Sequence, residues 1–300
     1  MESIPLIGEL ASLGAALIWA VSLTLFSRFG SVLNPTALNL WKNSIALVCF
    51  AALILFIKPE WPDGWEVYVA FGLSGILGLA VGDTALFAAL QRLGAQNTSV
   101  SQCCVPLITG GLAYIFLSES LSAGEVLGMI ITGLAIFLVI RHDNNRRKQS
   151  KIELDLFGGL FFAAIAALCQ AGAVVIIRHY LQGVDVALGT AIRLLPAFCV
   201  LFLVGAFRGD VAKIIEGLNT RSYDFLILSV AALFGTFLGL LMMSTGAKYA
   251  KAGISAALTA TYPLWIIPLS VWIAKESVSI KKSLYTVIAV VGVGIMMAAG

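Results

Sequence analysis

The chain has 300 residues, of which 60% are hydrophobic and 12% are charged, and its formal net charge is +3. A soluble domain carries about 25% charged residues, so this composition excludes a soluble globular protein and predicts an integral membrane protein. The small net charge excludes nucleic-acid binding through a basic surface. The cysteines and histidines have no spacing typical of a metal site, so the sequence predicts neither a metal nor a cofactor.

Ten apolar runs are long enough to cross a bilayer, which takes about 20 mostly apolar residues. In chain order they cover residues 8–27, 36–57, 67–90, 95–117, 121–140, 154–177, 186–207, 224–247, 252–274 and 279–298. The longest connections are 58–66, 141–153 and 208–223, which leave no room for a soluble domain. We therefore expect an all-α polytopic membrane protein with ten transmembrane helices.

The hydrophilic, basic segment 141–153 divides this bundle into two parts. A first five-helix repeat covers residues 1–140, the linker covers 141–153, and a second five-helix repeat covers 154–300. Because five is an odd number, the second repeat enters the membrane in the opposite sense to the first. The sequence thus predicts an inverted repeat, a design typical of secondary transporters, whose substrate site lies near the midplane between the halves.

Several landmarks recur between the two halves. The stretch VPLITGGLAYIFLSESLS begins at residue 105, and YPLWIIPLSVWIAKESVS begins at residue 262. Pro106 and Pro263 are 157 residues apart, and so are Glu119 and Glu276. A basic residue also follows the start of the second helix in each half. We interpret these landmarks as the two copies of one duplicated unit.

The second-half segment GAKYAKAGISAALTATYPLWIIPLSVWIAKESVS resembles the signature of EamA-type transporters of the drug/metabolite transporter superfamily. The first half carries a weaker copy, ALQRLGAQNTSVSQCCVPLITGGLAYIFLSESLS, and Trp19 in the first helix also fits. The sequence departs from the family at Ser118 and Lys275, where glycine is usual before the corner glutamate. The resemblance covers essentially the whole chain. It implies transport, often export, of small metabolites through a cavity between the halves.

Three charged residues lie inside the expected spans, namely Lys42, Asp83 and Arg193. Charges at membrane depth are costly and are by default functional. Lys42 and Asp83 lie roughly 9–10 Å from the same membrane face at about 1.5 Å per helical residue, so a Lys42–Asp83 ion pair is sterically allowed. The alternative for the two bases is snorkelling to the headgroups, and the alternative for Asp83 is a purely structural role as the partner of Lys42.

Uncharged polar and aromatic side chains at span depth complete the expected substrate site. They are densest on the fourth and ninth helices, which correspond to each other in the two repeats. The candidate substrate-binding residues are Trp19, Lys42, Asn43, Asp83, Ser101, Gln102, Gln170, Arg193, Thr259, Tyr262 and Trp265.

The repeated prolines and glutamates have predicted structural roles. Pro106 and Pro263 remove a backbone hydrogen bond inside their spans, so we expect kinks or hinges there. Glu119 and Glu276 lie at tight corners between helices, where a carboxylate can cap the exposed N–H groups of the following helix. Proton transport by these two acids is the alternative.

Two readings from other classes compete with a transporter. The run AVGD ending at Asp83, together with Tyr223-Asp224, has a faint similarity to intramembrane aspartyl proteases, in which two carboxylates share a proton. The first glycine of that motif is Ala80 here, and the order of the motifs is reversed. A scaffold or receptor without transport is the third reading, against which the predicted inverted repeat argues.

The function predicted from the sequence is therefore secondary transport, most simply export, of a small polar metabolite by alternating access between the repeats. An amino acid or a related zwitterion or anion is the expected substrate class. The expected partners are this small molecule and the lipid bilayer, without nucleic acid. Coupling to protons and the choice between monomer and homodimer stay open.

The distribution of basic residues predicts the orientation. Of the 19 Lys and Arg residues, 13 lie in connections on the side opposite the termini, and 4 lie on the side of the termini. Basic residues in short loops stay in the cytoplasm. We expect a multi-pass protein of a bacterial inner membrane with both termini outside the cytoplasm, although relatives of the resembled family more often keep both termini inside.

Overall fold

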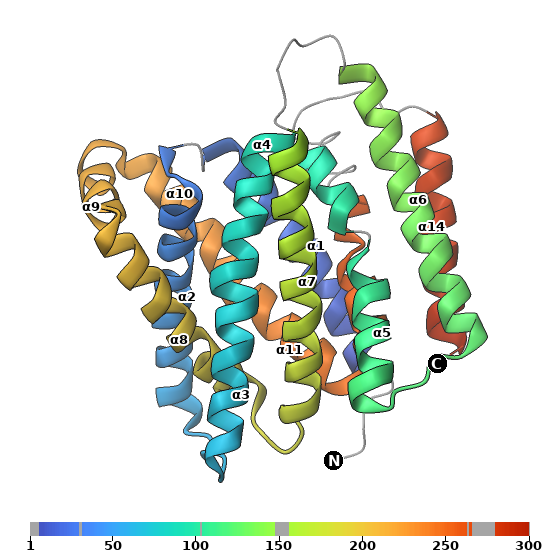
Figure 1. Ribbon diagram of the computed structural model, residues 1–300, viewed down its shortest axis with the longest axis horizontal. Helices are drawn as coiled ribbons and strands as arrows, with labels where there is room; N and C mark the ends of the chain where they lie inside the picture. The colour runs from blue at the N-terminus through green and yellow to red at the C-terminus, as the bar shows by residue number, and fades with distance from the viewer. Residues whose placement is uncertain are drawn as a thin grey trace.

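The computed structural model describes residues 6–29, 32–102, 104–147, 156–262, 264–265 and 280–299. Every regular element in these ranges is helical (Figure 1). In chain order the elements are α1 (Ile7–Phe29), α2 (Pro35–Ile57), α3 (Trp65–Gly75), η2 (Ile76–Gly82), α4 (Asp83–Gln102), α5 (Val105–Leu117), α6 (Ala123–Arg147), α7 (Leu156–Tyr180), α8 (Val186–Phe207), α9 (Asp210–Thr220), α10 (Ser222–Ala232), η3 (Leu233–Leu238), α11 (Gly239–Tyr249), α12 (Ala252–Thr259) and α14 (Ile280–Ala299).

Six stretches of helix are long and apolar enough to cross a membrane. They cover Ile7–Phe26, Pro35–Ile57, Trp65–Leu93, Phe157–Tyr180, Val186–Phe207 and Ser222–Tyr249, and two shorter apolar helices cover Val105–Leu117 and Ala123–Ala135. Large apolar side chains such as those of Phe56, Phe157 and Phe207 are exposed on the outside of the bundle, where lipid takes the place of water. The prediction of an all-α polytopic membrane protein is therefore confirmed for the described residues.

Side-chain caps set the start of the second helix in each half. Asn34 accepts a hydrogen bond from a backbone N–H in the first turn of α2 at 2.9 Å, and Asp185 does the same for α8 at 3.0 Å. Such caps satisfy N–H groups that have no partner within the helix. Lys42 and Arg193 each lie eight residues after their cap, so the two helices carry their basic residue at the same depth.

Two segments of π-helix interrupt the long helices near the middle of the bundle. The first, η2, joins α3 to α4, and the second, η3, joins α10 to α11. They begin at Ile76 and Leu233, which are 157 residues apart, the same separation as between the two repeated prolines. A π segment changes the direction of nearby carbonyl groups and is frequent at functional sites. Here both π segments contribute to the central cavity described below.

The predicted division between the third and fourth spans is wrong in its position. The expected spans were 67–90 and 95–117, but α4 continues without a break to Gln102, and the next helix, α5, begins at Val105. Pro106 lies in the first turn of α5, where a proline loses no helical hydrogen bond. The predicted mid-helix kink at Pro106 is thus a helix start, because the chain breaks just before the proline.

The connection 208–223, predicted as a loop, contains the short helix α9. Its apolar side chains gather on one face, and Ile214 on that face is buried. Asn34 donates a hydrogen bond to Asp210 at 2.6 Å and so ties the start of α9 to the start of α2. Figure 1 shows α9 at the edge of the bundle, beside α8 and α10.

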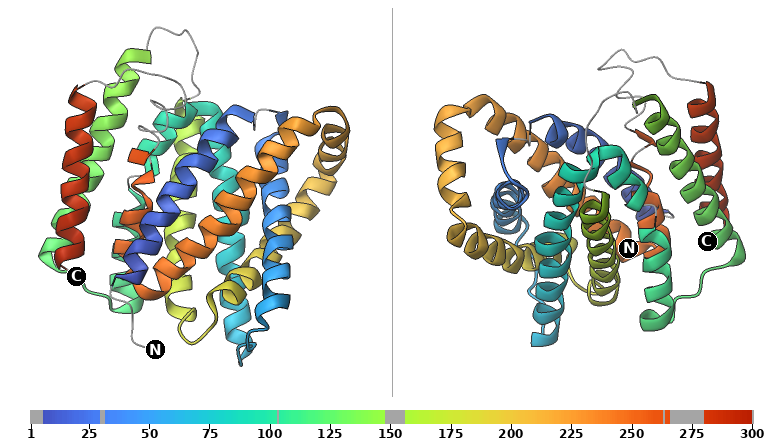
Figure 2. Two further views of the ribbon diagram at one scale, coloured as in Figure 1. Left: turned by 180° about the vertical axis from the view of Figure 1, so that it is seen from behind. Right: turned by 45° about the horizontal axis from the view of Figure 1, so that its top comes forward.

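The helices pack in pairs that recur between the halves. α2 packs against α8, α5 against α12, and α6 against α14. Two further pairs correspond to each other, because α1 packs against α11 as α4 packs against α7. Both other views show α6 and α14 side by side at one edge of the molecule, away from the central helices (Figure 2).

Small residues permit the closest helix crossings. At Gly75, where α3 crosses α8, an added Cβ atom would lie 1.7 Å from the carbonyl oxygen of Arg193. At Gly235, in η3, it would lie 2.4 Å from the side chain of Ser22 on α1. Membrane helices approach closely at such positions because packing replaces the hydrophobic effect as the driving force. The crossing at Gly75 also fixes the backbone that carries Arg193.

Candidate functional site

A cavity of about 160 Å³ lies among the central helices. It is bordered by α1, α2, α5, α7, α8, α11 and α12, by η3, and by the region where η2 meets α4. Eight of the eleven residues predicted to bind substrate line it, namely Trp19, Lys42, Asp83, Gln102, Gln170, Arg193, Thr259 and Tyr262. Residues from both halves of the chain therefore converge on one space.

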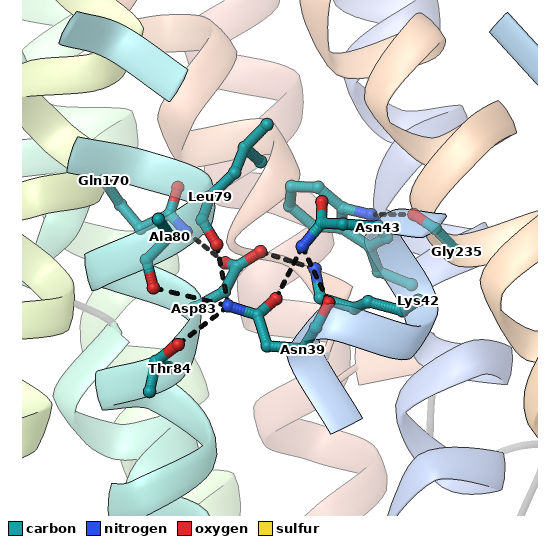
Figure 3. A network of polar contacts seen from close by, with 10 residues as sticks. Asn39, Lys42, Asn43, Leu79, Ala80, Asp83, Thr84, Gln170 and Gly235 are labelled. Carbon is teal, nitrogen blue, oxygen red and sulfur yellow. Dashed lines mark hydrogen bonds and ion pairs between the residues drawn. The ribbon is translucent and has the colours of Figure 1, made fainter. Parts of the chain in front are cut away.

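Asp83 is the centre of the polar network in this cavity (Figure 3). Its Oδ2 accepts a hydrogen bond from Nζ of Lys42 at 2.5 Å, which confirms the expected pairing of these two residues. Its Oδ1 accepts a hydrogen bond from Nε2 of Gln170 on α7 at 2.8 Å. Charged hydrogen bonds of this kind are the strong ones in a water-poor interior. Asp83 thus joins α2 in the first half to α7 in the second.

Two asparagines on α2 hold the neighbouring π segment. Asn39 donates hydrogen bonds to the carbonyl of Leu79 at 2.8 Å and to the hydroxyl of Thr84 at 2.8 Å (Figure 3). Asn43 donates to the side-chain oxygen of Asn39 at 2.8 Å. Asn43 therefore lies behind the cavity rather than on its wall. The sequence analysis missed Asn39, although its position one helical turn before Asn43 was a signal for it.

Arg193 is buried beside the cavity, and two of its three guanidinium nitrogens have no hydrogen-bond partner among the described residues. The residue is 2% exposed, and neither Nε nor Nη1 of its guanidinium has a hydrogen-bond partner among the described residues. Nε2 of Gln102, which is 8% exposed, also lacks a partner there. Asp83 is the only acid among the described residues of the cavity wall, against the two bases Lys42 and Arg193. With all three ionised, the wall carries one net positive charge.

Trp19 and Thr259 have hydrogen-bond partners within the protein. Nε1 of Trp19 donates to the carbonyl of Gly235 in η3 at 2.8 Å. The hydroxyl of Thr259 donates to the carbonyl of Ser255 one turn earlier in its own helix. The indole therefore offers its ring to the cavity and keeps its N–H for the π segment.

The other predicted residues either are absent from the cavity lining or have side chains outside the described part of the chain. Trp265 is 36% exposed and is absent from the lining. The side chain of Ser101, together with Pro263 and Glu276, lies outside the described residues. Pro196, which the sequence analysis did not single out, lies inside α8 three residues after Arg193. Since proline has no N–H, it removes one hydrogen bond from that helix.

Glu119 caps a different helix from the one predicted. Its carboxylate accepts hydrogen bonds from Nε of Arg178 at 2.6 Å and from the backbone N–H of Ala252 at 2.9 Å, so it caps α12 rather than the following α6. The start of α6 has its own capping box between Ser122 and Glu125. That local pair already occupies the helix end, which leaves Glu119 to reach across to the second half.

The carboxylate pair of an aspartyl protease is not formed in this cavity. Both oxygens of Asp83 are bonded to Lys42 and Gln170. Asp224 lies in the first turn of α10 and is absent from the lining. The described residues therefore give the protease alternative no support.

Comparison with known proteins agrees with this geometry. The EamA-like transporter family matches the chain twice, over residues 6–141 and 157–298. An uncharacterized transporter of Archaeoglobus fulgidus is 21% identical over 272 residues, which cover 91% of each chain. The uncharacterized transporter YyaM of Bacillus subtilis is 22% identical over 273 residues, with 89% of this chain and 85% of the relative covered.

One solved crystal structure shares the fold at 16% identity, with a TM-score of 0.77 over 96% of this chain and 97% of its own. The family match across both halves, the buried polar cavity and the membrane-spanning helices all indicate the same kind of protein. The chain is a multi-pass membrane transporter that belongs to the EamA-like transporter family, within the drug/metabolite transporter superfamily.

Proposed function

We propose that the protein is a secondary transporter, acting as an exporter, that carries a small polar metabolite by alternating access between two inverted repeats. An amino acid or a related zwitterion or anion is the proposed substrate class. The observation that carries the proposal is one cavity whose polar wall is built from both halves, with Asp83 hydrogen-bonded to residues of α2 and α7. A site shared by two halves is what rocking of one half against the other requires.

Matching contacts support the two-repeat arrangement. Ser22 on α1 donates a hydrogen bond to the carbonyl of Ala231 on α10 at 3.1 Å. Ser74 on α3 donates to the carbonyl of Ala173 on α7 at 3.0 Å. Ser22 and Ala173 are 151 residues apart, as are Lys42 and Arg193, whereas Ser74 and Ala231 are 157 apart, as are the π segments. The same helix crossing thus occurs twice, with donor and acceptor exchanged.

Closure on one side of the membrane supports alternating access. Helix α1 begins and helix α14 ends at the same end of the bundle, which we call the termini side (Figure 2). Near this side Glu119 pairs with Arg178 at 2.6 Å, and Glu125 pairs with Lys251 at 2.8 Å. Each pair joins an acid of the first half to a base of the second. In the proposed cycle these contacts break when the cavity opens to the termini side.

Counterflow in proteoliposomes tests the proposal. Vesicles loaded with an unlabelled solute are mixed with the same labelled solute outside, using a panel of amino acids, organic acids, sugars, nucleosides and organic cations. We expect labelled uptake above that of empty vesicles for at least one solute, and an imposed pH gradient then tests coupling to protons. A panel without any exchange contradicts the proposed function.

Two variants at the cavity and one matched control locate the transport path. Gln102→Ala and Tyr262→Phe should change transport while leaving expression and monodispersity close to those of the unmodified protein. Tyr223→Phe is the control, because Tyr223 is exposed at the start of α10 and away from the cavity. If both cavity variants transport like Tyr223→Phe, the substrate path has been assigned to the wrong helices.

A further inference from the structure

The charges of the cavity wall specify the substrate class more closely than the proposed function does. This inference rests on the proposed function. Lys42 and Asp83 neutralise each other at 2.5 Å, whereas Arg193 has no acid bonded to it among the described residues. A buried charge without a bonded partner is strongly unfavourable, and so is a buried donor without an acceptor. The unmatched group in this cavity is therefore a cation together with its N–H donors.

We propose that Arg193 binds the carboxylate of the substrate and that Gln102 donates a second hydrogen bond to it. The planar guanidinium is suited to a carboxylate, to which it can donate two parallel hydrogen bonds. Both side chains line the same cavity, and both have buried nitrogen donors without a partner in the described residues. A carboxylate in the cavity neutralises the excess charge, and it accepts from these buried donors once their side chains turn toward the cavity.

The same wall argues for a monoanion over a zwitterion. An ammonium group needs a carboxylate or several acceptor oxygens when it leaves water. Asp83 is the only acid among the described lining residues, and its two oxygens already accept from Lys42 and Gln170. The charge of the only acid on the described wall is thus already balanced by Lys42, whereas Arg193 has no bonded acid there.

The rest of the cavity lining favours an anion whose remaining part, apart from the carboxylate, is apolar. Most of the other lining side chains are apolar and include Leu23, Phe26, Val174 and Met243. Apolar surface contributes about 25 cal/mol per Å² buried, so it favours a hydrocarbon or aromatic group over a sugar. The inferred substrate is a small monocarboxylate with an apolar body.

Thermal unfolding of the purified full-length protein with four matched probes tests the inference. The probes are 3-phenylpropanoate, 3-phenylpropanamide, phenethylamine and L-phenylalanine, with 4-methylpentanoate and its amide as a second body. Because a ligand that binds only the folded state raises the melting temperature, we expect concentration-dependent shifts with the two carboxylates. Smaller shifts are expected with L-phenylalanine, and none with the amides or the amine. Equal shifts with acid and amide, or no shift with either carboxylate, overturn the inference.

Substitution of Arg193 distinguishes binding from a structural role. In Arg193→Gln the carboxylate probes should no longer raise the melting temperature. This corresponds to a loss of affinity of roughly 100-fold or more. Without ligand it should not lower the melting temperature, since it removes a buried charge that has no bonded partner. Arg193→Lys should weaken binding by about tenfold, because it keeps the charge but not the planar donor geometry. Gln102→Leu should reduce the affinity severalfold.

Arg208→Gln is the matched control, since Arg208 follows the end of the same helix and is exposed. It should respond to the probes like the unmodified protein. If Arg193→Gln instead unfolds at a lower temperature without ligand, and the carboxylate probes still raise its melting temperature, Arg193 is structural and the inference fails. Carboxylate binding without transport contradicts the proposed function alone, whereas transport of zwitterionic amino acids without binding of the carboxylate probes contradicts the inference alone.

Discussion

At the scale of single residues, the Lys42–Asp83 pair has the largest energetic consequence. Lys42 and Asp83 are both buried, and the 2.5 Å contact between them places two opposite charges in a region that lipid and protein shield from water. The attraction between buried charges compensates for the cost of removing each from water only while both are present. Loss of either one therefore exposes the full cost of burying the other.

A double-mutant comparison tests this dependence. Asp83→Asn leaves a buried ammonium without its anion and should destabilise the protein by about 3–5 kcal/mol. Adding Lys42→Met removes that ammonium, so the double variant should recover much of the lost stability. The measurements are the melting temperature and the yield of monodisperse protein after purification. A double variant no more stable than Asp83→Asn alone contradicts the pairing in the folded protein.

At the scale of elements, the close crossing of α3 and α8 is decided by one glycine. A Cβ atom at Gly75 would lie 1.7 Å from the carbonyl oxygen of Arg193, and a backbone atom cannot rotate out of the way as a flexible side chain can. Gly172 in the middle of α7 has no atom within 4 Å of the corresponding position. Both glycines lie in helices, but an added Cβ atom meets backbone at Gly75 and open space at Gly172, so Gly172 is a suitable control.

Gly75→Ala should therefore destabilise the protein by about 1–3 kcal/mol through overpacking. Gly172→Ala should be neutral or slightly stabilising, because alanine loses less backbone entropy in a helix than glycine. Because the Gly75 crossing carries Arg193, Gly75→Ala should also weaken binding of 3-phenylpropanoate. Equal melting temperatures for the two alanine variants contradict the close crossing.

Most elements that depend on local hydropathy were predicted correctly, whereas those that depend on contacts with distant parts of the chain were not. Hydropathy located the spans because a membrane helix requires a long apolar run, whatever its neighbours are. The π segments η2 and η3 were not predicted, because their sequences are as apolar as the α-helices that flank them. The break before Pro106 was misplaced because the polar, glycine-containing stretch 91–94 indicates a turn, whereas α4 continues through it to Gln102.

The candidate site shows the same limit. Lys42, Asp83 and Arg193 were predictable because charges at membrane depth are rare and costly. The partner of Glu119 was not, because Ala252 lies 133 residues away and contributes only a backbone N–H. The lack of bonded partners at Arg193 was also beyond the sequence, since it depends on which acceptors the other helices bring to the cavity.

At the scale of the whole molecule, orientation in the membrane follows from the loop charges. By the spans predicted from the sequence, 13 of the 19 basic residues are assigned to the side opposite the termini and 4 to the termini side. On the termini side Arg178 and Lys251 are already paired with acids. The bias predicts that the side opposite the termini faces the cytoplasm and that both termini face outward.

A reporter that fluoresces only in the cytoplasm tests this orientation. It is fused after Gly300 in one protein and inserted within residues 144–149 in another. The central fusion should be bright and the C-terminal fusion dark, with equal amounts of both proteins in the membrane confirmed by immunoblot. A bright C-terminal fusion with a dark central one reverses the orientation and leaves the cavity assignment unaffected.

The two ion pairs on the termini side have a kinetic consequence. Both acids lie around the short connection between α5 and α6, and Lys251 with the backbone N–H of Ala252 lies at the corner that joins α11 to α12. Separating these two corners therefore removes the ion pair at Glu125 and the helix cap at Glu119 in the same movement, whereas Arg178, the ion-pair partner of Glu119, lies at the end of α7. In the proposed cycle both contacts therefore break together when this face opens, so that states with only one of them broken are short-lived.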